Sequence, residues 1–258
     1  MKSPLVLVTG SSGRIGRAVV AELQKRGLSV RGFDRIPTPH LTDMVLGSVT
    51  DRATVDQATA GVGTLIHLAA TPDDADFLTE LLPNNLAGLY HVMESARLAG
   101  VRRIVLASSG QVNWWQQHSG PHPVRVDQPI SPRSWYAATK MFMESIGYSF
   151  TVAHSMSCIV ARLGWCPRTP EQADEIAGAD WAKDVYFSPG DAGRFFACCV
   201  EAPETVRYAL VNASSRPYRT ARLELKEAKE LLGFEPQETW PEGIDIVRGT
   251  TGTSAPSR

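Results

Sequence analysis

Short apolar runs alternate along the chain with stretches whose apolar residues recur every three to four positions. The runs are nearly continuous and rich in β-branched residues, which is typical of parallel strands covered on both faces. They lie at 5–9, 29–33, 64–68, 103–108, 158–162 and 207–212. Helices are expected from near Arg14 to a C-terminal cap at Gly27, and over 52–60, 76–99, 136–154 and 189–201. This alternation predicts an α/β fold, a Rossmann-like doubly wound parallel sheet with right-handed crossovers.

Composition narrows the possible partners and the location. With a net charge of -1 and a pI near 6.6, the chain has no electrostatic reason to bind nucleic acid or an anionic membrane. No apolar run approaches the roughly 18 residues of a membrane span, and the N-terminal run is too short for a signal peptide. The four cysteines read as buried, reduced thiols, so we expect a cytoplasmic protein.

Three glycines separate the first strand from the first helix in "LVLVTGSSGRIGRAVVAEL", residues 5–23. The free N–H groups at a helix N-terminus favour an anion. Gly10 permits the tight turn, Gly13 lets a phosphate approach the backbone, and Gly16 lets the helix pack on the strand. Asp34 follows the next strand, 18 residues beyond Gly16, where a carboxylate can accept hydrogen bonds from both adenosine ribose hydroxyls. The motif predicts dinucleotide binding.

The acidic residue also bears on which dinucleotide is bound. Asp34 would repel a 2′-phosphate, which favours NAD over NADP. Arg14 and Arg35 lie close in sequence to the glycine motif and to Asp34, so either could pair with such a phosphate. Both are also compatible with solvated surface residues.

A second group of candidate functional residues lies in "SWYAATKMFMES", residues 134–145. Tyr136 and Lys140 are one helical turn apart and share a face. An ammonium group at that distance, together with a nicotinamide cation, is expected to lower the tyrosine pKa from its usual value near 10. Such a tyrosine can move a proton while a hydride passes to or from the cofactor.

Several segments in order along the chain carry a resemblance to a known family. They are "TGSSGRIG" at 9–16, Asp34, "HLAA" at 67–70, "SSGQV" at 108–112, "YAATK" at 136–140 and "RLGWCP" at 162–167. The sequence resembles the short-chain dehydrogenase/reductase superfamily, in its extended, NAD-dependent epimerase/dehydratase branch. The resemblance implies a Rossmann domain and an NAD(P)-dependent dehydrogenase or reductase.

The same resemblance implies roles for individual residues. Ser109 would hydrogen-bond the substrate oxygen beside Tyr136, and Lys140 would also hold the nicotinamide ribose. The residues expected to contact the cofactor are Gly10, Ser12, Gly13, Arg14, Ile15, Gly16, Asp34, Arg35, Ser48, Val49, Leu68, Ala69, Ala70, Asn85, Tyr136, Lys140 and Leu163. The residues expected to contact the substrate are Ser109, Gly110, Gln111, Tyr136 and Trp165.

Within the branch, the length and the segments "IVLASS" at 104–109 and "ARLGWCP" at 161–167 are similar to those of uronate dehydrogenases. Dehydratases of the branch carry an acidic pair after the active-site serine, and uronate dehydrogenases carry asparagine and histidine. Here Gly110 and Gln111 stand at those positions. Uronate dehydrogenases also clamp the substrate carboxylate with an arginine, for which Arg168 and Lys183 are the candidates, although both also read as surface residues.

Tryptophans gather in the loops expected at the carboxyl ends of the strands. These are Trp114, Trp115, Trp135 and Trp165. Tryptophan stacks on the apolar face of a sugar ring or encloses a hydrophobic carbonyl compound, and it also fills loop cores and subunit contacts. The tryptophans are therefore compatible with either a sugar or a hydrophobic carbonyl compound as the substrate.

These observations predict two regions. Residues 1–162 form an NAD-binding Rossmann domain, and 163–258 form a small substrate-binding region, with about 185–215 returning to the sheet. We expect an NAD-dependent oxidoreductase that acts on a small sugar-like substrate, of uronate or aldose type, or on another secondary alcohol or carbonyl compound. A sugar epimerase that reduces its cofactor transiently and a non-catalytic dinucleotide sensor are the alternatives. We also expect a homo-oligomer and, since no zinc or calcium spacing occurs, no metal.

Overall fold

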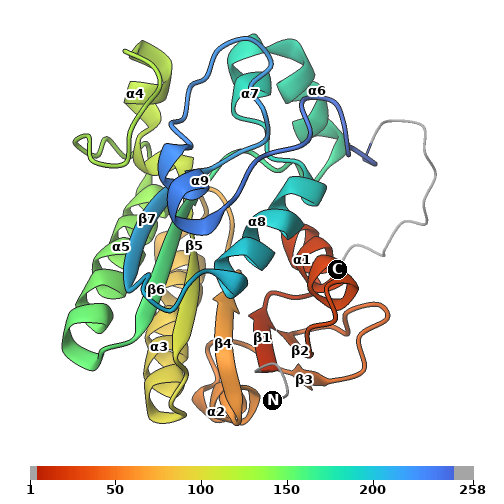
Figure 1. Ribbon diagram of the computed structural model, residues 1–258, viewed down its shortest axis with the longest axis vertical. Helices are drawn as coiled ribbons and strands as arrows, with labels where there is room; N and C mark the ends of the chain where they lie inside the picture. The colour runs from red at the N-terminus through yellow and green to blue at the C-terminus, as the bar shows by residue number, and fades with distance from the viewer. Residues whose placement is uncertain (1–4, 247–258) are drawn as a thin grey trace.

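The computed structural model describes residues 5–246, which form a sheet with helices on both faces (Figure 1). Among these residues, seven parallel strands pair in the order β3-β2-β1-β4-β5-β6-β7. The strands are β1 (Leu5–Thr9), β2 (Val30–Asp34), β3 (Met44–Leu46), β4 (Val62–His67), β5 (Arg103–Ser109), β6 (Ser157–Leu163) and β7 (Tyr208–Ala213). The predicted Rossmann-like parallel sheet is confirmed.

The strand order reverses between β1 and β4. From β1 the sheet extends through β2 and β3 on one side and through β4 to β7 on the other. Where neighbouring parallel strands send their connections to opposite sides, a crevice forms beyond their carboxyl ends. In this chain the crevice lies between the segments that begin at Gly10 and Leu68.

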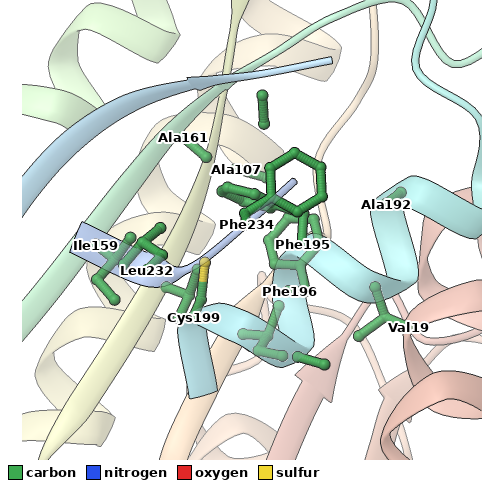
Figure 2. Packing of buried hydrophobic residues seen from close by; sticks show 14 of the residues in the cluster. Val19, Ala107, Ile159, Ala161, Ala192, Phe195, Phe196, Cys199, Leu232 and Phe234 are labelled. Atoms are coloured by element: carbon green, nitrogen blue, oxygen red, sulfur yellow. The ribbon is translucent and has the colours of Figure 1, made fainter. Parts of the chain in front are cut away.

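One face of the sheet is covered by α1 (Arg14–Lys25), α8 (Pro189–Glu201) and α9 (Lys226–Leu232). Figure 2 shows Phe195 and Phe196 of α8 gathered with Phe234 in this core. The Phe195 and Phe234 rings meet edge to face, with centroids 5.1 Å apart. At the contact between α8 and α1, a Cβ added to Gly193 would lie 2.8 Å from the Ala18 carbonyl, so this glycine allows the close approach.

The other face is covered by α2 (Arg52–Thr59), α3 (Gly88–Leu98) and α5 (Trp135–His154). The helix expected over 76–99 consists of a π-helical segment, η1 (Phe77–Ala87), followed by α3. Pro83 lies inside η1, and because proline lacks an N–H it cannot make the regular helical bond there. The Ser134 side chain caps α5 by accepting a hydrogen bond from Ala137 N at 3.3 Å.

Several short elements were not expected from the sequence. They are β3, the 3₁₀ turn η2 (Gly110–Val112), α4 (Trp114–Ser119), α6 (Pro170–Gly178), α7 (Asp180–Asp184) and α9. Most span too few residues for a periodic pattern to develop, and β3 is a three-residue edge strand. In Figure 1, α4, α6 and α7 stand above the carboxyl ends of the strands.

After β6 the chain leaves the sheet at Leu163 and returns to it through α8 and β7. The division at residue 162 stays a prediction. The first residues of the predicted Rossmann domain, 1–4, and the last residues of the predicted substrate-binding region, 247–258, lie outside the described residues. Within residues 5–246, no helix combines the length and apolarity that crossing a membrane requires. In the same part of the chain, no three histidine, cysteine or carboxylate side chains gather as ligands for a metal ion.

Candidate active site

A cavity of about 930 Å³ opens at the crevice between β1 and β4 and continues beyond β5 and β6. One end is lined by the glycine loop and the end of β2, and the other end by residues that follow β4, β5 and β6. Tyr136 and Lys140 of α5 face the same space. The cavity therefore brings together the glycine motif and the Tyr136–Lys140 pair that were identified in the sequence.

The glycine loop has the shape that a phosphate needs. Gly10 has a φ of +69°, and a Cβ there would lie 2.8 Å from Ala69 N. A Cβ on Gly16 would lie 2.1 Å from the Gly10 carbonyl oxygen, so only glycine lets α1 start this close to the loop. No side chain caps the α1 N-terminus at Gly13, which leaves its first N–H groups free for an anion.

The end of β2 supplies the polar groups of an adenosine site. The Asp34 carboxylate accepts hydrogen bonds from Ser12 N at 2.9 Å and Arg35 N at 2.7 Å, which fixes it at the cavity wall. Ser48 and Val49 line the same end. Together with the glycine loop, these residues fit a dinucleotide whose diphosphate meets α1 and whose ribose meets Asp34.

The two arginines considered for a 2′-phosphate lie in different surroundings. Arg35 is exposed at the adenosine end of the cavity. Arg14 is mostly buried, lines the cavity and forms an ion pair with Asp245, near the end of the described chain. Arg14 is thus not a freely solvated surface charge.

Most of the remaining residues expected at the cofactor line the cavity. They are Gly10, Ser12, Gly13, Ile15, Gly16, Leu68, Ala69, Ala70 and Leu163. Asn85 differs, because its side chain accepts from Thr71 N at 2.8 Å and donates to Thr71 O and Thr139 Oγ1. It is not in the cavity wall and holds the loop after β4 against α5, and its expected contact with the cofactor stays a prediction.

Ser109, Tyr136 and Lys140 meet near the middle of the cavity. Ser109 ends β5, and Tyr136 lies in the first turn of α5. The Lys140 amine is buried, donates to the Ala107 carbonyl at 2.9 Å and lies 5.5 Å from the centre of the Tyr136 ring. The three residues predicted to be catalytic thus line one cavity.

Burial dominates the electrostatics of this group in the chain by itself. Burial raises the pKa of Tyr136 to about 12, with the Asp73 carboxylate acting in the same direction, while the Ser109 side chain and Arg168 lower it. Burial lowers the pKa of Lys140 to about 8. Burial is the largest influence on the pKa of Tyr136 in the chain by itself, and the expected lowering by the neighbouring amine together with a bound nicotinamide cation stays a prediction.

A buried ion pair supports the site from behind. Arg162 of β6 donates to both carboxylate oxygens of Glu144 on α5, at 2.9 and 2.8 Å. Glu144 also accepts from Ser108 Oγ at 2.6 Å, and Arg162 also donates to Asn113. These bonds tie the helix that carries Tyr136 to the strand that carries Ser109.

The far end of the cavity is aromatic and polar. Trp114, Trp165 and Trp181 line it, with the Trp165 and Trp181 rings stacked at 6.0 Å and the Trp114 ring edge-on to Trp181 at 5.6 Å. Trp115 and Trp135, also considered for the pocket, are exposed and are not in the cavity wall.

Gly110 and Gln111, which stand at the positions of asparagine and histidine in uronate dehydrogenases, both line the cavity. A Cβ on Gly110 would lie 3.0 Å from the Gln117 amide nitrogen, so the Gln117 amide occupies the space of a side chain at 110. Sequence reasoning missed Gln117, Trp181 and Asp73, because no motif or spacing marks them and only the folded loops bring them to the site.

Comparison with known proteins agrees with this geometry. Residues 6–165 match the model of the NAD dependent epimerase/dehydratase family. L-arabinose 1-dehydrogenase (NAD(P)(+)) of Haloferax volcanii is 26% identical over 254 residues, which cover 90% of this chain and 96% of that protein. Uronate dehydrogenase of Pseudomonas putida is 28% identical over 167 residues, which cover 62% of this chain and 60% of that protein.

A solved glucuronic acid dehydrogenase from Chromohalobacter salexigens has the same fold. It superposes with a TM-score of 0.77 at 23% identity, covering 92% of this chain and 85% of that one. At this identity the likeness speaks for the fold alone. The family match spans more than half of the sequence, and the chain belongs to the NAD dependent epimerase/dehydratase family.

Proposed function

We propose that the protein is an NAD-dependent dehydrogenase that oxidises a hydroxyl-bearing carbon of a small, sugar-like substrate. The observation that carries the proposal is the single cavity that joins the phosphate-binding loop to Ser109, Tyr136 and Lys140. Relatives named L-arabinose 1-dehydrogenase and uronate dehydrogenase support the substrate class. The stacked tryptophans offer a surface for a sugar ring.

Each of the three residues has a distinct role in this reaction. The Ser109 hydroxyl hydrogen-bonds the reacting oxygen of the substrate and orients it toward Tyr136. The phenolate of Tyr136 takes the proton from that oxygen as the carbon–hydrogen bond breaks. NAD, when bound, would supply the hydride acceptor and the positive charge of an oxidised nicotinamide ring.

Lys140 has two roles, one toward the Tyr136 phenol and one toward the cofactor. Its amine is held by the Ala107 carbonyl at 2.9 Å, so its position does not depend on a ligand. When protonated, it stabilises the Tyr136 phenolate and offers donors to the nicotinamide ribose. Asp34, at the other end, accepts from the adenosine ribose and disfavours a 2′-phosphate, which supports NAD over NADP.

The test is a substrate panel run with the purified protein and either NAD or NADP. It contains aldoses, uronates, secondary alcohols and a hydroxysteroid, and NADH formation is followed by absorbance. We expect NADH to accumulate with at least one sugar and faster with NAD. An epimerase would convert a sugar without accumulating NADH, and a sensor would bind NAD but turn over nothing; either result overturns the proposal.

We further propose that the protein pairs with a second copy of itself through α3 and α5. The outer faces of these helices expose large apolar side chains, with Tyr90 59%, Leu98 66%, Tyr148 58% and Val152 68% exposed. Phe142, also on α5, is 43% exposed. Light scattering after gel filtration should give a mass above the 28.1 kDa of one chain; a mass equal to one chain contradicts the pairing.

A cytoplasmic location is proposed as well. Cys158, Cys166, Cys198 and Cys199 are all free thiols, as a reducing compartment keeps them. Fractionation of the native host tests this, and recovery of the protein outside the cytoplasm overturns it.

A further inference from the structure

Four polar side chains from three segments meet at the substrate end of the cavity. Asp73, in the loop after β4, forms an ion pair with Arg168, in the segment after β6. The Asp73 carboxylate also faces the side-chain amides of Gln111 at 3.5 Å and Gln172 at 3.4 Å. A carboxylate of the protein itself thus occupies a position surrounded by one arginine and two amide donors.

The backbone holds Asp73 in this position. Its φ is +60°, a conformation that aspartate and asparagine adopt more readily than other residues with side chains. The loop that carries it is anchored by Asn85, which bonds both backbone groups of Thr71. The loop that carries Asp73 is thus anchored two residues before it.

This cluster lies close to the reacting atoms. Asp73, Gln111, Arg168 and Gln172 all line the cavity that contains Tyr136. Asp73 raises and Arg168 lowers the pKa of Tyr136, so both charges act on the phenol. A substrate whose hydroxyl reaches Tyr136 would extend toward this cluster.

We propose that Asp73 fills the carboxylate-binding position of the cavity from within, so that the enzyme selects neutral sugars over uronates and other sugar acids. The inference rests on the proposed dehydrogenase function and names its substrate class. The pair is partly exposed, with Arg168 37% and Asp73 48% exposed, and an acidic sugar would have to displace Asp73 from Arg168 and leave two carboxylates facing each other. A neutral sugar leaves the pair intact, because its hydroxyls can donate to Asp73 and accept from the two glutamine amides.

The other charges near the cavity support this selection. Asp74, Glu80 and Glu175 also line it and add negative charge. Lys183 is outside the cavity wall and pairs with Asp180 at 3.0 Å. Arg133 lines the cavity but is exposed, with its guanidinium 4.4 Å from the centre of the Trp114 ring.

The test uses pairs of sugars that differ only at C6, glucose with glucuronate and galactose with galacturonate, plus glucose 6-phosphate as a second type of anion. We expect the wild type to show kcat/KM at least about tenfold higher for the neutral member of a pair that it turns over. A preference for the acid member overturns the inference but leaves the dehydrogenase assignment in place. Absence of turnover with every sugar removes the proposed function and this inference with it.

Variants test which side chains cause the preference for neutral sugars. Asp73→Asn keeps the size of the side chain and the tolerance for positive φ, and it should raise uronate kcat/KM relative to the neutral sugar by about tenfold. Adding Arg168→Gln should cancel that gain, whereas adding the control Arg125→Gln, at an exposed arginine outside the cavity wall, should preserve it. If Asp73→Asn lowers both activities equally, Asp73 has a structural role and the inference fails.

Binding gives a readout that does not depend on turnover. Calorimetry of the NADH complexes should show galacturonate binding about tenfold more tightly to Asp73→Asn than to the wild type. Equal affinity in the two proteins, with unchanged melting temperature, would overturn the inference.

Discussion

The Lys140 amine lies 5.5 Å from the centre of the Tyr136 ring, and it is buried on the same face of α5. Both groups lose favourable hydration of their charged forms there, so the pKa of Tyr136 is raised to about 12 and that of Lys140 is lowered to about 8. Burial of these two groups therefore disfavours the Tyr136 phenolate and the protonated Lys140 amine in the chain by itself.

The buried amine predicts how stability changes with pH. Because the pKa of Lys140 falls from 10.5 to about 8 on folding, the unfolded chain binds the extra proton between these values. The contribution of Lys140 to the free energy of unfolding should therefore rise by about 3 kcal/mol as pH increases from 8 to 10.5. Denaturant unfolding of wild type and Lys140→Met across this range measures it; a constant difference between the two proteins contradicts the prediction.

The charges around Tyr136 predict opposite shifts in the pH profile of activity. Asp73 disfavours the phenolate, so Asp73→Asn should move the rise of kcat/KM to lower pH. Arg168 favours it, so Arg168→Gln should move the rise to higher pH. Profiles with a neutral sugar and saturating NAD give the midpoints, and shifts of the same sign in both variants would refute this account of the site.

Asp34 predicts the choice of cofactor. Replacing it by Asn removes the charge that repels a 2′-phosphate, so NAD affinity should fall about tenfold while NADP affinity rises. Calorimetry with both nucleotides measures the two constants. Asp43→Asn is the matched control, because Asp43 lies just before β3, outside the cavity wall, and pairs with Arg31. An unchanged preference in Asp34→Asn contradicts the assigned ribose contact.

The Glu144–Arg162 pair predicts a large effect on stability. Both side chains are buried, so Glu144→Ala leaves the Arg162 charge without its main partner and should cost about 3–5 kcal/mol. The exposed Arg125–Asp127 pair is the control, and Asp127→Asn should change stability by less than about 1 kcal/mol. Chemical denaturation compares the free energies of unfolding of the two variants. Equal losses would show that the buried pair contributes no more to stability than the exposed pair.

The sequence predicted the architecture because each long strand is buried on both faces and is followed by a helix with an apolar stripe. β1, β4, β5 and β6 are read directly from such runs. β3 was missed because an edge strand of three residues has no pattern to detect. The helices α4, α6 and α7 were missed for a related reason, since their shapes depend on packing among the loops.

The residues of the candidate site likewise fall into those that the sequence identified and those that only the fold reveals. Gly10, Gly16 and Tyr136 belong to local motifs whose spacing carries the chemistry, so the sequence alone identified them. Asp73 and Trp181 act through neighbours that are far away in the chain, and only the fold brings them together. The effect of burial on the pKa of Tyr136 was not predicted, because spacing reveals a neighbouring charge but not the loss of water around the phenol.

The most direct measurement of the central claim compares wild type with Tyr136→Phe on the best sugar of the panel, with NAD binding measured on the same samples. Removing the phenol oxygen should lower kcat by at least about a hundredfold, since general acid–base catalysis contributes at least that much. The dissociation constant for NAD should change by less than about threefold, because the glycine loop and Asp34 hold most of the dinucleotide. Retained NADH formation in Tyr136→Phe would contradict the account.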